Sequence, residues 1–238
     1  MQFTFAFPPW LRAAVVTMAC LVGTGTASAD QDITIGNPSF ENPLWNPTSA
    51  PDEEFYGSAA KWKPLLDSQG EEVGVTGTAH LSSTYLDPLV VGQEVGFAGD
   101  NGFTTPFQTG ASSMYQVLSD LVSPGANYRL TLAVGTQPLT NVDSHYSVEL
   151  WAGTSLLKEI HGTIAGGTGF QQVTLDTVGA GAGKLKIVLS ETNGGQTLFD
   201  NVRLSIVPEP STLAMSGTAL LFGLGYARRR VRKMATAL

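Results

Sequence analysis

Apolar and polar residues alternate with a period of two in several short stretches between residues 30 and 206. The alternation is clearest over residues 128–134, 145–151, 173–175 and 184–190. It is typical of half-buried antiparallel strands, because successive side chains of a strand point to opposite faces. Turn-forming residues bound these stretches, as at 152–154 and 193–195. Only one stretch, 114–121, fits a helix as well as a strand. The pattern predicts an all-β domain, and its size favours a two-sheet antiparallel β-sandwich.

The first 29 residues predict a signal peptide. Arg12 precedes the apolar run 13–22, and Ala27-Ser28-Ala29 supplies the small residues that signal peptidase requires. The run is too short to span a bilayer stably, which favours export and cleavage after Ala29. A lipoprotein signal ending at Cys20 is the alternative, although its apolar residue three positions upstream is missing.

Composition narrows the class of the exported domain. Cys20 is the only cysteine, so cleavage would leave a chain without disulfides, stabilised by core burial, by a metal or by both. Residues 30–207 hold 19 acidic and 7 basic residues, a net charge of −12. Such a charge repels nucleic acids and anionic membrane surfaces, and it suits a surface protein or a domain that binds cations.

The C-terminal segment, residues 207–238, has three parts in a fixed order. Pro208-Glu209-Pro210 forms a stiff linker, residues 213–227 carry no charge, and the cluster Arg228-Arg229-Arg230 follows. Fifteen helical residues rise about 22 Å, which is short for a span, and the arginines would stay on the cytoplasmic side. An ordinary tail anchor is one interpretation. The order of the parts resembles the PEP-CTERM sorting signal more specifically.

The PEP-CTERM resemblance implies a route to the cell surface. It implies recognition by an exosortase after transient anchoring in the inner membrane of a Gram-negative, exopolysaccharide-producing bacterium. The chain would then be released or transferred to the cell surface or the extracellular matrix.

A second resemblance covers most of residues 33–206. It rests on the opening segment 33–41, the segment 124–130 and the closing segment 199–204. Together they resemble the galactose-binding-like jelly roll of non-catalytic carbohydrate-binding modules. The resemblance implies a jelly-roll β-sandwich, and it implies exopolysaccharide as a partner without naming a sugar.

Asp200 is the most informative acidic residue. It has the same strand parity as Leu198 and Val202, so it should point towards the core, where a carboxylate needs a partner. In the modules that the domain resembles, the residues at the positions of Glu41 and Asp200 bind a structural calcium ion. Backbone carbonyls near Asn37 would complete that site. The alternative is that Asp200 only accepts hydrogen bonds from backbone amides.

Aromatic side chains are the candidates for sugar contact, because pyranose rings stack on flat apolar faces. Trp45 and Tyr56 lie in a Pro-rich, acidic region, and Trp151 falls on the polar face of its stretch. Trp62 is expected in the core. The chain lacks the usual hydrolase and zinc-protease motifs, so an enzyme is not expected. A glycan-binding module and an inert structural or adhesive matrix protein remain open, with a secreted hydrolase as a weaker alternative.

Overall fold

The computed structural model describes residues 29–41, 54–56, 60–66, 75–81, 87–99, 112–136, 142–193 and 195–208. Asp30–Val207 form one compact unit, and residues 1–29 with 208–238 form a second. The predicted signal peptide and uncharged helix lie outside the described residues, as do Glu209, Pro210 and the arginine cluster. Within the described ranges, no helix has the length and apolar character needed to cross a membrane.

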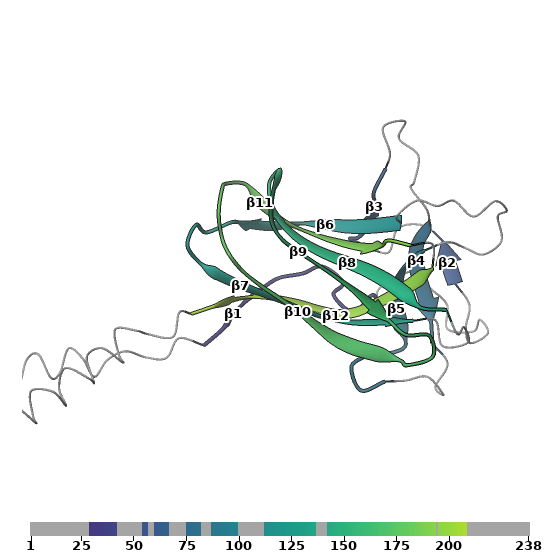
Figure 1. Cartoon of the computed structure of the whole chain (residues 1–238). Coiled ribbons are helices and arrows are strands. Elements are labelled where there is room, and N and C mark those ends of the chain that lie inside the picture. The colour runs from purple at the N-terminus through teal and green to yellow at the C-terminus, as the bar shows by residue number, and fades with distance from the viewer. Residues whose placement is uncertain are drawn as a thin grey trace, which may run out of the picture. The chain divides into compact units, whose positions relative to one another are not determined.

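The unit Asp30–Val207 is an antiparallel β-sandwich of two sheets (Figure 1). In the seven-stranded sheet the order is β10-β7-β12-β5-β4-β2, and β1 also pairs with β12. Its strands are β1 (Gln31–Ile33), β2 (Glu54–Tyr56), β4 (Val75–His80), β5 (Glu94–Gly99), β7 (Asn127–Thr136), β10 (Phe170–Val178) and β12 (Gln196–Val207). In the five-stranded sheet the order is β3-β6-β11-β8-β9. Its strands are β3 (Lys63–Pro64), β6 (Ser112–Leu121), β8 (Ser144–Ala152), β9 (Ser155–Ile164) and β11 (Lys184–Glu191).

The sandwich confirms the all-β prediction. The four alternating stretches lie within β7, β8, β10 and β11, and the ambiguous stretch 114–121 is part of strand β6. The predicted turn at Gly153 joins β8 to β9, where this glycine has a φ of 58°. Strand alternation therefore located these long strands correctly.

The main core lies between the two sheets. It is built from the inward-facing alternate residues of both sheets, among them Leu130, Leu150, Leu175, Ile187 and Phe199. Trp62 also belongs to it, as predicted from the sequence, and is only 1% exposed. Its ring stacks on that of Phe40 with 5.3 Å between the centroids, and its indole nitrogen donates to the carbonyl oxygen of Asn37 at 3.1 Å.

A second, smaller apolar cluster lies on the other face of the seven-stranded sheet. It contains Ala79, Leu81, Val95, Phe97, Ala133, Phe170 and Leu198, and the partly buried Leu89 and Val90 pack against it. Phe97 and Leu198 alternate with the main-core residues Ala98 and Phe199, so they point away from the main core. The seven-stranded sheet therefore carries an apolar cluster on each face.

Strand β12 is irregular in its middle. Residues 196–199 pair with β5, and residues 204–206 pair with β1 on the same side. Against β7, the register shifts between Asp200 and Arg203, and Asn201 has a φ of 50°. On the side of β5 and β1, residues 200–203 have no strand partner, because they lie between the start of β5 and the end of β1.

Candidate functional site

Two segments that are distant in sequence contact β12 at this irregularity. The carbonyl oxygen of Pro38 accepts a hydrogen bond from the amide of Val202 at 2.9 Å. From the second segment, the amide of Val91 donates to Oδ2 of Asp200 at 2.5 Å. The side-chain amide of Asn201 donates to the carbonyl oxygen of Leu89 at 3.5 Å. Side-chain groups of residues 200 and 201 thus replace the backbone pairing that β12 loses here.

Asp200 is a buried carboxylate with one unsatisfied oxygen. Its side chain is fully buried, as expected, although the parity argument does not hold. Leu198 belongs to the second cluster and Val202 to the main core, because the strand is irregular between them. Within the part of the chain that the structure describes, Oδ1 has no hydrogen-bond partner. Burial raises the pKa of Asp200 from 3.8 to about 7, the amides of Val91 and Asn201 oppose this shift, and the negative charge of Glu41 adds to it. Glu41 therefore lies close enough for the two carboxylates to repel one another, as the sequence led us to expect.

Glu41 binds backbone amides of the same segment that contacts Asp200. Its Oε1 accepts the amides of Gln93 at 2.8 Å and Glu94 at 2.7 Å. Gly92 lies between Val91 and these residues with a φ of 84°, and a Cβ added there would come within 2.1 Å of Oε1 of Glu41. A glycine is required at position 92, because any larger residue would displace the carboxylate.

Glu94 is a third acidic residue, and it lies near Glu41. Nδ1 of His80 and Oε1 of Glu94 are 2.7 Å apart, and both side chains are largely buried. Burial raises the pKa of Glu94, the hydrogen bond and charge of His80 oppose this shift, and Glu41 adds to it. Among the described residues, no group of three or more His, Cys, Asp and Glu side chains has the spacing of a metal site. Side chains therefore supply two donors to the Asp200 site, Glu41 and Asp200.

The backbone carbonyls named from the sequence are less available than expected. The oxygen of Asn37 already accepts hydrogen bonds from the indole of Trp62 and from the amide of Phe40. A cation at Asp200 would need its remaining oxygen ligands from other backbone groups or water. The orphaned Oδ1 of Asp200 is the feature that such a cation would satisfy.

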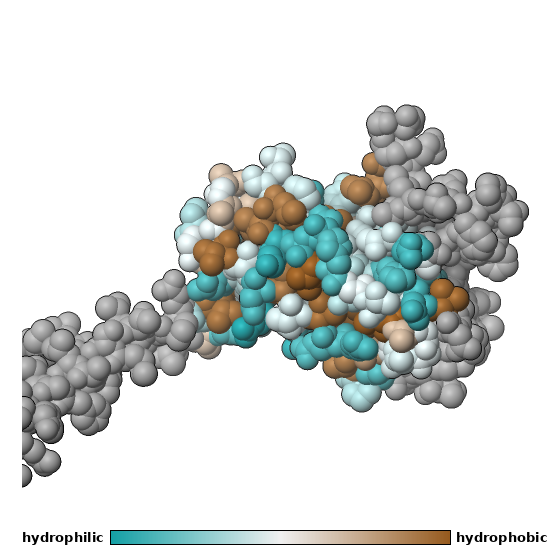
Figure 2. Space-filling model, in the orientation of Figure 1, coloured by the Kyte–Doolittle hydropathy of each residue, from teal (hydrophilic) through white to brown (hydrophobic). Residues whose placement is uncertain are grey.

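A second candidate site lies on the outer face of the five-stranded sheet, where the register aligns side chains in rows across the strands. One row contains Val117, Lys186, Trp151 and Leu156. The next contains Tyr115, Val188, Glu149 and Glu159, and the third contains Ser113, Ser190, Ser147 and His161. These residues alternate with those of the main core, so the rows face outwards. Hydrophilic and hydrophobic residues are interspersed over the view of the domain in Figure 2.

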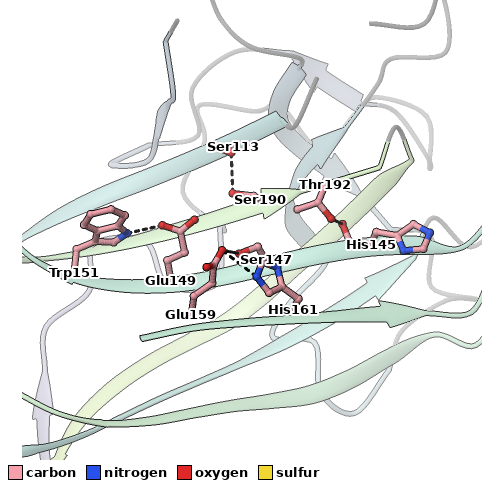
Figure 3. A network of polar contacts seen from close by, with 9 residues as sticks. All are labelled: Ser113, His145, Ser147, Glu149, Trp151, Glu159, His161, Ser190 and Thr192. Atoms are coloured by element: carbon pink, nitrogen blue, oxygen red, sulfur yellow. Dashed lines mark hydrogen bonds and ion pairs between the residues drawn. The ribbon is translucent and has the colours of Figure 1, made fainter. Parts of the chain in front are cut away.

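Trp151 is the largest aromatic side chain of these rows (Figure 3). It is partly exposed on the polar side of β8, as predicted from the sequence. Its indole N–H donates to Oε2 of Glu149 at 2.5 Å, and the ammonium nitrogen of Lys186 lies 4.4 Å from the ring centroid. The hydrogen bond and the cation–π contact fix the ring on the surface.

Polar groups continue from Trp151 along the sheet. Figure 3 shows Glu159 receiving two partners, the hydroxyl of Ser147 at 3.0 Å and Nε2 of His161 at 3.2 Å. Behind them, the hydroxyl of Ser113 donates to that of Ser190 at 2.7 Å. Glu149 and Glu159 are direct cross-strand neighbours, a pairing that places two carboxylates side by side. The face thus presents an aromatic ring next to several hydrogen-bonding groups.

The sequence-predicted ligand residues do not form one site. Trp45 lies outside the described residues. Tyr56 lies on β2 at an edge of the seven-stranded sheet, whereas Trp151 lies on the five-stranded sheet. The sequence analysis missed the partners of Trp151. The parity of β8 alone could have placed Glu149 beside it, but Lys186 and Glu159 depend on the pairing of three strands.

Comparisons with known proteins give two family matches. Residues 31–205 match a family model described as HpiC1 cyclase, and residues 207–232 match one described as the PEP-CTERM protein-sorting motif. No curated protein matches the chain.

Solved structures with a similar fold share little sequence with the chain. The TmCBM61 module, solved with β-1,4-galactotriose, is 12% identical with a TM-score of 0.47, covering 74% of this chain and 98% of that one. The xylan-binding CBM22-1 domain of Paenibacillus barcinonensis Xyn10C is 8% identical with a TM-score of 0.43, covering 67% and 98%. The K1 adhesin domain of Lys-gingipain from Porphyromonas gingivalis is 15% identical with a TM-score of 0.44, covering 64% and 97%. These likenesses are too distant to transfer a ligand to this chain.

Proposed function

The chain belongs to the HpiC1-like family and ends in a PEP-CTERM sorting motif, and from this premise we propose that it is a surface protein whose jelly-roll sandwich binds a glycan. The sorting motif implies processing by an exosortase and therefore export. The proposed partner is exopolysaccharide at the cell surface or in the extracellular matrix. The proposed binding surface is the outer face of the five-stranded sheet around Trp151.

One observation carries this proposal: Trp151 is fixed on an open sheet face beside a series of hydrogen-bonding side chains. An indole ring offers a flat apolar surface to a sugar ring, and neighbouring carboxylates and hydroxyls can pair with its hydroxyl groups. The contacts drawn in Figure 3 use one carboxylate oxygen of Glu149 and one of Glu159, which leaves the second oxygen of each for a sugar hydroxyl. The rows run across the strands, so an extended chain of sugars could contact several of them at once.

A glycan array with the full-length protein tests this proposal. Binding to one or more polysaccharides is expected, and Trp151→Ala should weaken it by roughly 1–3 kcal/mol, a factor of about five or more. Arg129→Ala is the matched control, since Arg129 is exposed on the other sheet and forms an ion pair with Asp176. Equal binding by wild type and Trp151→Ala would remove this face from the proposal. Absence of all glycan binding would favour the inert structural or adhesive role.

We also propose that Asp200 and Glu41 hold a structural calcium ion. The support is the orphaned Oδ1 of a fully buried aspartate and a second carboxylate close enough to repel it. A divalent cation between the two would remove the repulsion. Such a cation would be useful because the chain's only cysteine, Cys20, lies in the predicted signal peptide, so the exported domain would have no disulfide. Calcium supplies no chemistry in this proposal and only stabilises the fold. Isothermal calorimetry with calcium chloride tests it, and no detectable heat at millimolar metal would reject it.

The second candidate function is an enzyme, and the family description favours it because it names a cyclase. We propose that the sandwich is instead non-catalytic. The two possibilities differ in what happens to the ligand, because a cyclase would convert it and a binding module would not. A thermal-shift screen of glycans against small apolar compounds would separate them. Conversion of any bound compound, followed by mass spectrometry, would contradict the non-catalytic proposal.

A further inference from the structure

One end of the sandwich is the end at which the chain leaves for the sorting motif. Three connections lie there (Figure 1): residues 122–126 join β6 to β7, 153–154 join β8 to β9, and 179–183 join β10 to β11. These connections and the strand termini beside them are called the tether end below. We propose that the tether end docks on the anionic lipid surface of the membrane while the C-terminal segment is anchored there. This inference rests on the anchoring that the sorting motif implies and is independent of glycan binding.

Backbone hydrogen bonds join the three connections into one surface. The amide of Gly125 donates to the carbonyl oxygen of Gly179 at 2.9 Å, and the amide of Val122 donates to that of Gly183 at 2.9 Å. The amide of Gly153 donates to the carbonyl oxygen of the first residue of β11 at 2.8 Å. The tether end is therefore a fixed part of the fold that can present a defined face to a partner.

The chain leaves the sandwich beside this surface. Val207, the last residue of β12, pairs with Asn127, and Asn127 also pairs with Val178 at the end of β10. Only residues 208–212 separate Val207 from the uncharged segment that begins at Leu213. Five extended residues span at most about 18 Å, and the two prolines among them stiffen the linker. A domain on so short a linker meets the membrane with its tether end first.

The tether end exposes apolar side chains. Leu121 is 66% exposed, the most of any large hydrophobic side chain among the described residues, and Val178 is 55% exposed. Each lies at the terminus of a strand, directly before one of the connections. The three connections contain no Asp, Glu, Lys or Arg. Apolar side chains on an uncharged tip suit the boundary between lipid head groups and acyl chains.

The net charge of the domain is distributed unevenly in a way that fits this partner. Within four residues of the strand termini at the tether end, the sequence has five basic and six acidic residues. The rest of residues 30–207 has two basic and thirteen acidic residues. The five basic residues are Arg129, Lys158, Lys184, Lys186 and Arg203. The tether end therefore adds little to the repulsion of anionic lipid that the acidic domain as a whole would suffer.

A lysine adjoins the most exposed apolar side chain. Lys184 is the cross-strand partner of Leu121, and both are exposed. An apolar side chain that enters the head-group region would thus bring an ammonium group to the lipid phosphates. A basic residue near an anionic membrane surface strengthens binding about fivefold. Leu121 and Lys184 together supply the apolar and the electrostatic part of the docking.

Fluorescence quenching in vesicles tests this inference. The full-length chain carrying Cys20→Ser is reconstituted into vesicles of phosphatidylcholine with or without phosphatidylglycerol, so that a label reacts only with an introduced cysteine. Leu121→Cys places the label at the tether end. Asn193→Cys places it, also exposed, beyond the other end of β12, whose 12 residues span about 40 Å. With phosphatidylglycerol, a nitroxide on the lipid head group should quench the label at 121 about twofold more, or better, than the label at 193, because only the tether end reaches the head groups.

Charge variants sharpen the test. With the label at Val178→Cys, Lys184→Glu should lower the ratio of docked to undocked domains about fivefold or more. Lys63→Glu is the matched control, because Lys63 is an exposed lysine on β3 and not at the tether end. Its quenching should equal that of the unsubstituted chain.

Four results would overturn the inference. Equal quenching at 121 and 193 would mean that no particular end faces the lipid, and quenching at 121 that is independent of phosphatidylglycerol would mean that the linker alone explains the proximity. Disulfide-linked pairs of Leu121→Cys chains would show that the tether end contacts a second copy instead. A chain that fails to float with the vesicles would overturn the anchoring as well. A negative glycan array would leave the docking result unchanged.

Discussion

Replacement of Asp200 by Asn should stabilise the metal-free protein at alkaline pH. Burial raises the pKa of Asp200 from 3.8 to about 7. Each pKa unit corresponds to about 1.36 kcal/mol, so the ionised carboxylate destabilises the folded state by roughly 4 kcal/mol. Asparagine has nearly the same shape, keeps an oxygen for the amide of Val91 and carries no charge. The variant therefore loses this penalty.

The penalty has a defined pH window. Below pH 3.8 the carboxyl is protonated in both the folded and the unfolded state, so it costs nothing. Between 3.8 and about 7 only the unfolded state releases its proton, so the free energy of unfolding falls as pH rises. Above about 7 both states are ionised and the full penalty applies. From pH 5 to pH 8 the wild type should lose about 2.7 kcal/mol relative to Asp200→Asn.

Urea unfolding of both proteins in chelator, at pH 5 and pH 8, measures this difference. Comparison between the two proteins cancels the contributions of other groups, such as Glu94 and His80. Calcium at about 100 times its dissociation constant should then add about 2.7 kcal/mol to the wild type and nothing to the variant. If the free energy of unfolding of the wild type follows that of the variant between pH 5 and pH 8, the ionised carboxylate of Asp200 does not destabilise the folded state and the reasoning is refuted. Asp176→Asn, at an exposed position, serves as the control.

Four further predictions concern packing and sorting. Trp62→Ala should destabilise the domain by roughly 3–5 kcal/mol in urea unfolding, because the side chain is 1% exposed; a smaller loss would mean that the core closes over the gap. Gly96→Ala should cost roughly 1–3 kcal/mol, since the new Cβ would lie 2.4 Å from the ring of Phe40; unchanged thermal melting would contradict this. Replacing the arginines at 228–230 by Ala should impair membrane orientation and processing, and normal surface display by immunofluorescence would argue against it. N-terminal sequencing of the exported chain should begin at Asp30, whereas a lipidated Cys20 would reveal the alternative signal.

Much of the fold could be predicted from the sequence because stretches of β7, β8, β10 and β11 bury mainly one face. A strand with one buried face carries a period of two, which is visible without any knowledge of its partners. The stretch 114–121 was ambiguous because β6 is exposed at Val117 and Leu121, so its polar face holds apolar residues. The short strands β2 and β3 span three and two residues, too few to show a period.

The candidate sites were less predictable because they depend on pairing between distant strands. Asp200 is buried as expected, but its parity with Leu198 and Val202 did not place it, because the irregularity of β12 puts those two residues in different clusters. A family resemblance brought Glu41 to it. The contact between Asp200 and Val91 could not be predicted, since the two are 109 positions apart and meet through a backbone amide that any residue possesses. Likewise, Glu149 and Glu159 become neighbours only through the register of β8 and β9.

The position of β12 has a mechanical consequence for a protein tethered by its C-terminus. β12 ends at Val207, directly before the sorting motif, so tension on the tether is applied to this strand first. Within its sheet β12 lies between β7 on one side and β5 and β1 on the other. Tension along its axis must shear the hydrogen bonds on both sides together, whereas an edge strand could be peeled away one bond at a time. A tether at the C-terminus would therefore pull on a strand that is hydrogen-bonded on both sides.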